Sequence, residues 1–109
     1  MTSDDTDALI SALWEQFRPL VAARIAAIEQ YVAGAAESVE STPAHERRLT
    51  ALRSAAQDAA HNLAGGLGSY GRSNGSRIAG ELDAELRQPV DDLAVITGLV
   101  EKLRVATVE

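Results

Sequence analysis

The chain has 109 residues, of which 46% are hydrophobic, 24% charged and only 4% aromatic, and this composition favours one domain of closely packed helices over residues 1–109. It has no cysteine, which excludes disulfides, zinc–thiolate sites and cysteine nucleophiles. A net charge of −6 argues against nucleic-acid binding, and the absence of a signal-peptide pattern or of a membrane-length apolar run predicts a cytoplasmic protein with no membrane contact.

The first part of the chain shows apolar residues at steps of three and four, which predicts helices. We expect a first helix over about 4–18, capped by Asp4 or Asp5, and a second over about 21–37, with Pro19 breaking or kinking the chain between them. The apolar side of the first helix contains Leu9, Ile10, Leu13, Trp14 and Phe17. The two aromatic residues of this set are expected in the core or as a cover over the end of the bundle.

A third helix is predicted after a loop at 38–43, because Thr42 and Pro43 form a good N-cap and first-turn pair. Its pattern continues to about Tyr70, through three closely spaced glycines. The residues that share its buried stripe are Leu49, Leu52, Ala56, Ala59, Leu63, Leu67 and Tyr70.

The last part of the chain predicts a turn at 72–76, a fourth helix and a fifth helix opened by Pro89. The fourth helix buries Ile78, Leu82 and Leu86, and the fifth turns Val90, Leu93, Ile96, Val100 and Leu103 inward. Asp91 and Asp92 are expected on a solvated face. Short connections favour an all-α, up-and-down antiparallel four-helix bundle, to which the first helix is an additional N-terminal element.

His61 is the residue that most indicates a function. At about 100° per residue it lies roughly 160° from the centre of the buried stripe, so its side chain is expected to face outward. Gly65 and Gly68 follow one and two turns later, and they leave the neighbouring surface clear. His45, in the first turn of the same helix, has no such surroundings, and we expect it to be plain solvated surface.

Several other interpretations of this stretch stay open at this point. His61 alone is compatible with an idle surface histidine, and the glycines are compatible with a helix end at Gly66. A phosphate-cradling loop is disfavoured, because the GxxxxGKS pattern and a preceding strand are both missing. Asp58 could pair locally with His61, but such exposed pairs contribute little.

The run from His61 to Gly65, followed by Tyr70 and by Gly71 ten residues after the histidine, resembles the signature of the histidine phosphotransfer (HPt) domain. The common form is H-x-L-K-G, and a bacterial variant has H-x-L-A-G followed by an aromatic residue and glycine. Residues 78–86 resemble the next helix of the family, and 13–18 resemble the leading segment of some bacterial members. The likeness spans most of the chain, and its specific part covers about a dozen residues.

The resemblance implies a monomeric carrier without autokinase activity, which takes a phosphoryl group on His61 to or from an aspartate of a response-regulator receiver domain or a hybrid histidine kinase. The receiver supplies an acidic pocket and Mg²⁺, so the chain needs no metal or cofactor of its own. Neutral imidazole is a competent nucleophile for this transfer. The residues expected to contact the partner are Gln57, Asp58, Asn62, Ala64, Gly65 and Gly68.

Two positions depart from the family pattern. Ala64 stands where many members have lysine or arginine, and Gly66 replaces the usual serine or alanine. Asn62 or Arg72 could supply the missing donor. The departure at Ala64 keeps a second function open, a non-catalytic helical module that binds partners through the same face. An independent enzyme is disfavoured, because no acid, base and nucleophile stand at recognisable spacing.

Overall fold

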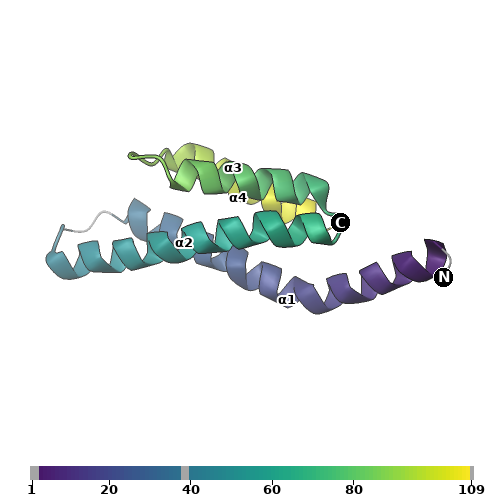
Figure 1. The fold of residues 1–109 in the computed structure, drawn as a ribbon. Coiled ribbons are helices and arrows are strands. Elements are labelled where there is room, and N and C mark those ends of the chain that lie inside the picture. Colours follow the sequence, from purple (N-terminus) through teal and green to yellow (C-terminus); the bar gives the residue numbers. More distant parts are fainter. Residues whose placement is uncertain (1–2, 38–39, 109) are drawn as a thin grey trace.

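The computed structural model describes residues 3–37 and 40–108, and within these ranges the chain forms four helices and no strand (Figure 1). The helices are α1 (Ser3–Ala36), α2 (Pro43–Ser69), α3 (Ser73–Leu86) and α4 (Leu93–Val108). Helix α2 packs on both α1 and α3, and α4 packs on α3 and α1. In Figure 1 the α1–α2 and α3–α4 connections lie at one end of the molecule and the α2–α3 connection at the other. The predicted all-helical class is confirmed.

Helix α1 is one continuous helix, so the prediction of a separate second helix was wrong, and of the two effects expected at Pro19 the structure excludes the break. Proline lacks an N–H and clashes with the preceding turn, which costs a helix interior about 3 kcal/mol. Trp14 and Val21, on either side of the proline, are both only 3% exposed. Because packing holds the backbone on both sides, the helix continues through Pro19. Asp4 and Asp5 lie within the helix, because α1 begins at Ser3.

The start of α2 follows the prediction. Thr42 has an extended backbone, and its Oγ1 accepts a hydrogen bond of 3.1 Å from the backbone N–H of His45. Pro43 occupies the first turn, where its missing N–H costs nothing. Residues 38 and 39 of the predicted loop lie outside the described residues.

The end of α2 also follows the prediction, since the helix runs to Ser69 and Tyr70 caps it. Gly71 has φ +73°, a left-handed conformation that favours glycine, and the next N–H, that of Arg72, donates to the carbonyl of Leu67 at 2.8 Å. The predicted turn at 72–76 is shorter than expected, because α3 begins at Ser73.

Helix α4 begins at Leu93, so the prediction that Pro89 opens a helix was wrong. The carboxylate of Asp92 accepts the backbone N–H of Val95 at 3.2 Å, which is the bond of an N-cap. Val90, predicted to face inward, is 82% exposed in the connection before this cap. The side chain of Asp92, three residues after Pro89, therefore sets the start of α4.

The core lies along the facing sides of the four helices. The predicted stripe of α2 is confirmed, because Ala56, Ala59, Leu63 and Leu67 are buried and Leu49, Leu52 and Tyr70 are half-buried. The other helices contribute Val21, Ile25, Ile28, Ile78, Leu82, Leu86, Ile96, Val100 and Leu103. Leu9, Ile10 and Leu13 are exposed, in contrast to the prediction, because the first turns of α1 extend beyond the bundle (Figure 1).

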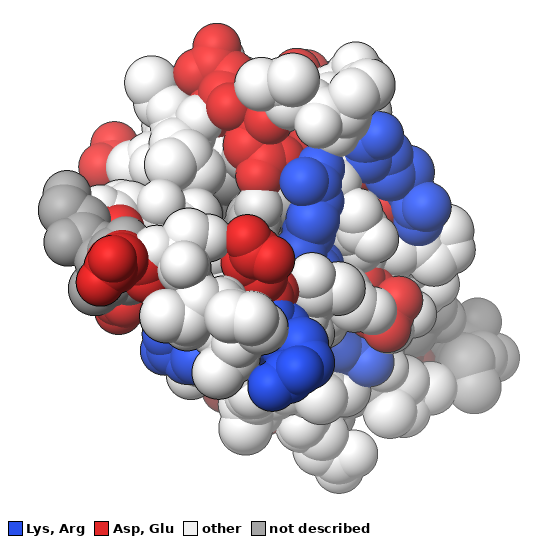
Figure 2. All heavy atoms as spheres, turned by 90° about the vertical axis from the view of Figure 1, so that its left-hand side faces the viewer, with Lys and Arg blue, Asp and Glu red and all other residues white. Residues whose placement is uncertain are grey.

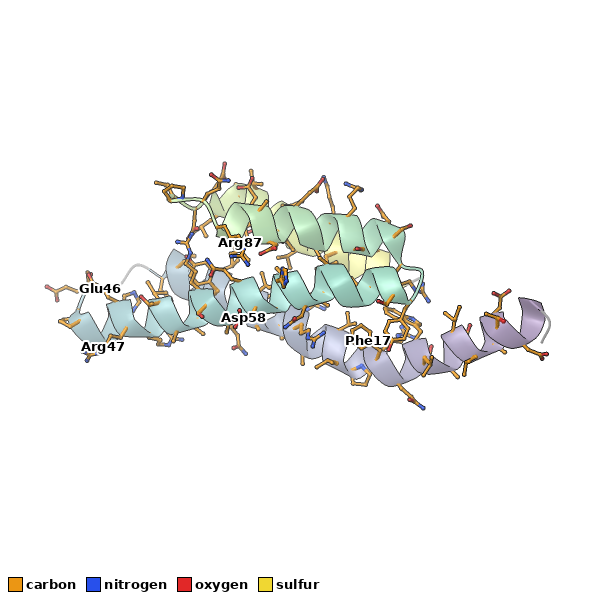
Figure 3. The ribbon with its side chains drawn as sticks, in the orientation of Figure 1. Phe17, Glu46, Arg47, Asp58 and Arg87 are labelled. Carbon is orange, nitrogen blue, oxygen red and sulfur yellow. The ribbon has the colours of Figure 1, made fainter. Side chains whose placement is uncertain are left out.

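An aromatic cluster covers the end of the bundle where α2 turns into α3. The rings of Phe17 and Tyr70 are stacked with centroids 4.8 Å apart, and Trp14 lies 6.2 Å from the first and 6.3 Å from the second. Figure 3 shows Phe17 on α1 beside the C-terminal part of α2. A Cβ atom at Gly66 would lie 2.7 Å from Cζ of Phe17, so glycine at that position admits the ring.

A polar cluster joins three segments near the opposite end. The hydroxyl of Tyr31 on α1 donates to Asp91, and Arg53 on α2 forms an ion pair of 2.8 Å with the same carboxylate. The side chain of Asp91 is only 14% exposed, so its assignment to a solvated face was wrong. Burial, followed by the hydrogen bond to Asp91, raises the pKa of Tyr31 to about 12.

Charged side chains of both signs are interspersed on the end of the molecule that carries the α1–α2 and α3–α4 connections. Figure 2 looks onto this end, and neither sign covers it continuously.

We predict that alanine has different effects at two adjacent glycines of α2. Gly65→Ala should stabilise the protein by about 1 kcal/mol, because alanine favours a helix and no atom lies within 4 Å of the new Cβ. Gly66→Ala should destabilise it by about 1 kcal/mol, because the methyl group displaces Phe17 from its stack on Tyr70. Urea unfolding of both variants measures this difference, and equal stabilisation by both substitutions would contradict the packing described.

We also predict a pH dependence from Tyr31. Because its folded pKa is raised from 10.0 to about 12, the stability contributed by the neutral phenol is fully present below pH 10 and is lost as the pH rises through about 12. The stability advantage of the wild type over Tyr31→Phe should therefore shrink across that interval. Urea unfolding of both proteins at a series of pH values measures it, and an advantage that grows with pH would contradict the assignment.

Candidate functional site

His61 lies on the outer side of α2, as predicted, with 69% of its side chain exposed. Its neighbours in the helix, Ala60 and Leu63, are fully buried, so the core holds the backbone that presents the imidazole. Nδ1 of the ring lies 3.2 Å from Oδ2 of Asp83, which comes from α3. The side chain of Asp83 is only 19% exposed, so the contact orients the ring from its protected side.

The carboxylate of Asp83 decides which ring nitrogen is free. An ionised carboxylate only accepts hydrogen bonds, so Nδ1 of His61 must carry the hydrogen in this contact. The neutral ring then keeps its lone pair on Nε2. The other oxygen of Asp83 accepts a hydrogen bond of 2.8 Å from Nε of Arg87, the residue that caps the C-terminal end of α3. Arg87 thus orients Asp83, and Asp83 orients His61.

Asp83, like Arg87 bonded to it, is a residue of the candidate site that sequence reasoning missed. It belongs to the stretch that resembles a family helix, but its chain position, 22 residues after His61, does not reveal the contact. Because Asp83 directly follows buried Leu82, it lies at one edge of the row of buried residues on α3. Which flank faces α2 depends on the rotation of α3 in the bundle, and the period of its apolar residues does not determine that rotation.

The residues beside His61 are small on both α2 and α3. Gly65 is exposed, and no atom lies within 4 Å of the position of a Cβ there. Half-buried Ala64 offers its carbonyl to Oγ of Ser76, which donates a hydrogen bond of 2.5 Å from α3. A Cβ at Gly68 would lie 3.3 Å from the same Oγ. The missing side chain of Gly65 therefore leaves space for a partner, whereas that of Gly68 also lets α3 pack closely on α2.

The remaining residues predicted at the site have different surroundings. Gln57 donates to the carbonyl of Leu86 at 2.7 Å, so it holds the end of α3. Asp58 and Asn62 are exposed on α2, and the partner of His61 is Asp83 and not Asp58.

Arg72, considered above as a substitute donor, is engaged at the end of the bundle. Its guanidinium lies over the ring of Trp14, with Cζ 4.3 Å from the ring centroid. Within the described part of the chain, Arg87 is the cation that joins the His61–Asp83 pair.

His45 lies in a different setting from His61. It lies in the first turn of α2, where its backbone N–H donates to Thr42, and the residue is half-buried, so it is less exposed than the solvated surface expected. Figure 3 shows its neighbours Glu46 and Arg47 at the N-terminal end of α2, whereas Arg87 lies over the middle of that helix.

No protein-family model, curated protein or solved structure matches this chain. Among the described residues, no helix combines the length and the apolar character needed to cross a membrane.

We predict that Asp83 controls the tautomer of His61. At a pH where the ring is neutral, two-dimensional ¹H–¹⁵N NMR should show the hydrogen of His61 on Nδ1 in the wild type and a tautomer mixture in Asp83→Ala. His45 serves as the internal control, because its ring signals should be the same in both proteins. A wild-type His61 with its hydrogen on Nε2 would rule out the proposed role of the carboxylate.

Proposed function

We propose that the protein is a histidine phosphotransfer carrier, in which Nε2 of His61 exchanges a phosphoryl group with the aspartate of a receiver domain. The observation that carries this proposal is the exposed His61 ring whose Nδ1 is bonded to Asp83, so that Nε2 keeps its lone pair next to the open Gly65. The resemblance of the run from His61 to Gly65 to the HPt signature supports it. The donor or acceptor is a response regulator or a hybrid histidine kinase.

In the proposed transfer step, the imidazole of His61 is the nucleophile. The Nε2 lone pair attacks the phosphorus of an aspartyl phosphate, the P–O bond to the aspartate breaks, and the carboxylate leaves with the electron pair. The imidazole gains positive charge as the N–P bond forms, while its Nδ1–H stays bonded to Asp83. The carboxylate offsets this charge and holds the ring in line with the breaking bond.

Phosphoryl transfer also requires cations near the oxygens of the transferred group. Ala64 supplies none, and in this proposal the Mg²⁺ of the receiver and Arg87 do so. Arg87 has 57% of its side chain exposed and is tied to the site through Asp83. The carrier itself binds no metal or cofactor, has no autokinase activity and acts in the cytoplasm. Its four helices form an up-and-down antiparallel bundle that keeps His61 on a rigid surface.

The direct test is phosphorylation by a receiver domain. Incubation with a receiver carrying labelled aspartyl phosphate and Mg²⁺ should transfer acid-labile label to the wild type and to His45→Gln, but not to His61→Gln. Uptake by His61→Gln, or a wild type that takes no label, would overturn the proposal. Binding of the receiver without uptake of label would identify the alternative function, a non-catalytic interaction module.

We predict that bulk at Gly65 obstructs the partner. Gly65→Gln should keep the fold, because the position is open, and should slow transfer by about tenfold or more, equivalent to about 1.4 kcal/mol in the barrier. Gly98→Gln on α4 is the matched control, because a Cβ there also meets no atom within 4 Å, and its transfer rate should equal that of the wild type. Equal rates in both variants would place the docking surface elsewhere. Gly68→Gln is a less direct probe, because it also displaces Ser76.

A further inference from the structure

The first turns of α1 form an arm, defined here as residues 5–13, that extends beyond the bundle. Every residue of the arm is exposed, and the first buried side chain of α1 is Trp14. Figure 1 shows this purple part of α1 projecting past the ends of the other helices. The exposed fractions of its three large apolar residues are 54% for Leu9, 39% for Ile10 and 40% for Leu13.

The arm lacks the tertiary support that a helix of this length needs. Helices shorter than about 12 residues are marginal on their own in water. Leu9, Ile10 and Leu13 lie within about 100° of one another around the helix axis, so they form one apolar face. In the described structure no residue of this apolar face is buried, so the face is available to pack against a partner.

An apolar hollow lies at the base of the arm, between α1 and α4. Its walls include Trp14 together with Val105 and Val108, whose exposed fractions are 65% and 73%. The charged residues that line it are both arginines, Arg18 and Arg104. Each has an acidic neighbour on its own chain, but these pairs are exposed, so they contribute little and can share a second carboxylate.

The charge of the arm is complementary to that of the hollow. The arm carries Asp5 and Asp7 and has no lysine or arginine. An acidic, apolar helix therefore fits an apolar hollow rimmed by Arg18 and Arg104, and it disfavours an anionic membrane surface. Each copy carries both an arm and a hollow. In a dimer with a two-fold axis, the arm of each copy can therefore contact the hollow of the other.

We propose that two copies of this chain dimerise through their arms, which lie antiparallel about a two-fold axis. The antiparallel arrangement brings Leu9, Ile10 and Leu13 of one copy against the arm and hollow of the other. The acidic start of each arm then lies near Arg18 and Arg104 of the other copy. The dimer replaces the monomer expected from the resemblance, and it does not depend on phosphotransfer.

Sedimentation equilibrium of the full chain over a range of concentrations tests the dimer. The wild type should dimerise, and Ile10→Glu should raise the dissociation constant at least tenfold while keeping its helix content by circular dichroism. Val90→Glu is the matched control, because Val90 is also exposed but lies in the α3–α4 connection, so it should dimerise as the wild type does. A wild type that is monomeric at all concentrations, or a dimer insensitive to Ile10→Glu, would overturn the proposal.

A charge reversal tests the orientation of the arms. Asp7→Arg and Arg18→Asp should each weaken the dimer, and the double variant should recover most of the lost affinity, since opposite charges again meet across the axis. Recovery supports the antiparallel arrangement. Losses that simply add in the double variant would overturn it.

Discussion

The close approach of α3 to α2 is the constraint on which the candidate site depends. Ser76 binds the carbonyl of Ala64 on one side of His61, and Gln57 binds the carbonyl of Leu86 on the other. These contacts fix how α3 is rotated and how far it has slid along α2. They therefore place Asp83 within hydrogen-bonding distance of the imidazole, a position that α3 alone could not specify.

The contact between His61 and Asp83 orients the ring but has little part in holding the fold. A pair in which one side chain is 69% exposed is screened by water, so its effect on the free energy of unfolding is small. The fold is held by the apolar core, in which Leu63, Leu67 and Leu82 are fully buried. Asp83 thus orients the ring, whereas the apolar core stabilises the bundle, so we expect substitution of Asp83 to leave the bundle folded.

The sequence predicted what depends on the helical period and missed what depends on tertiary contacts. The buried stripe of α2 and the outward position of His61 follow from residue spacing alone, as does the N-cap at Thr42. The continuity of α1 through Pro19 depends on packing to either side of it. The partner of His61 depends on the rotation of α3, and the burial of Asp91 depends on Tyr31, which is 60 residues away along the chain. None of these three is visible in local spacing.

In the proposed function, Nε2 of His61 receives the phosphoryl group, because Nδ1 is bonded to Asp83. The most direct measurement is the position of the phosphorus on the ring, from ³¹P and ¹⁵N NMR of the protein phosphorylated by a receiver domain in Mg²⁺. The account predicts a single phosphohistidine at His61 with phosphorus bonded to Nε2, because Nδ1 is bonded to Asp83. A phosphoryl group on Nδ1 of His61, or on His45, would contradict it.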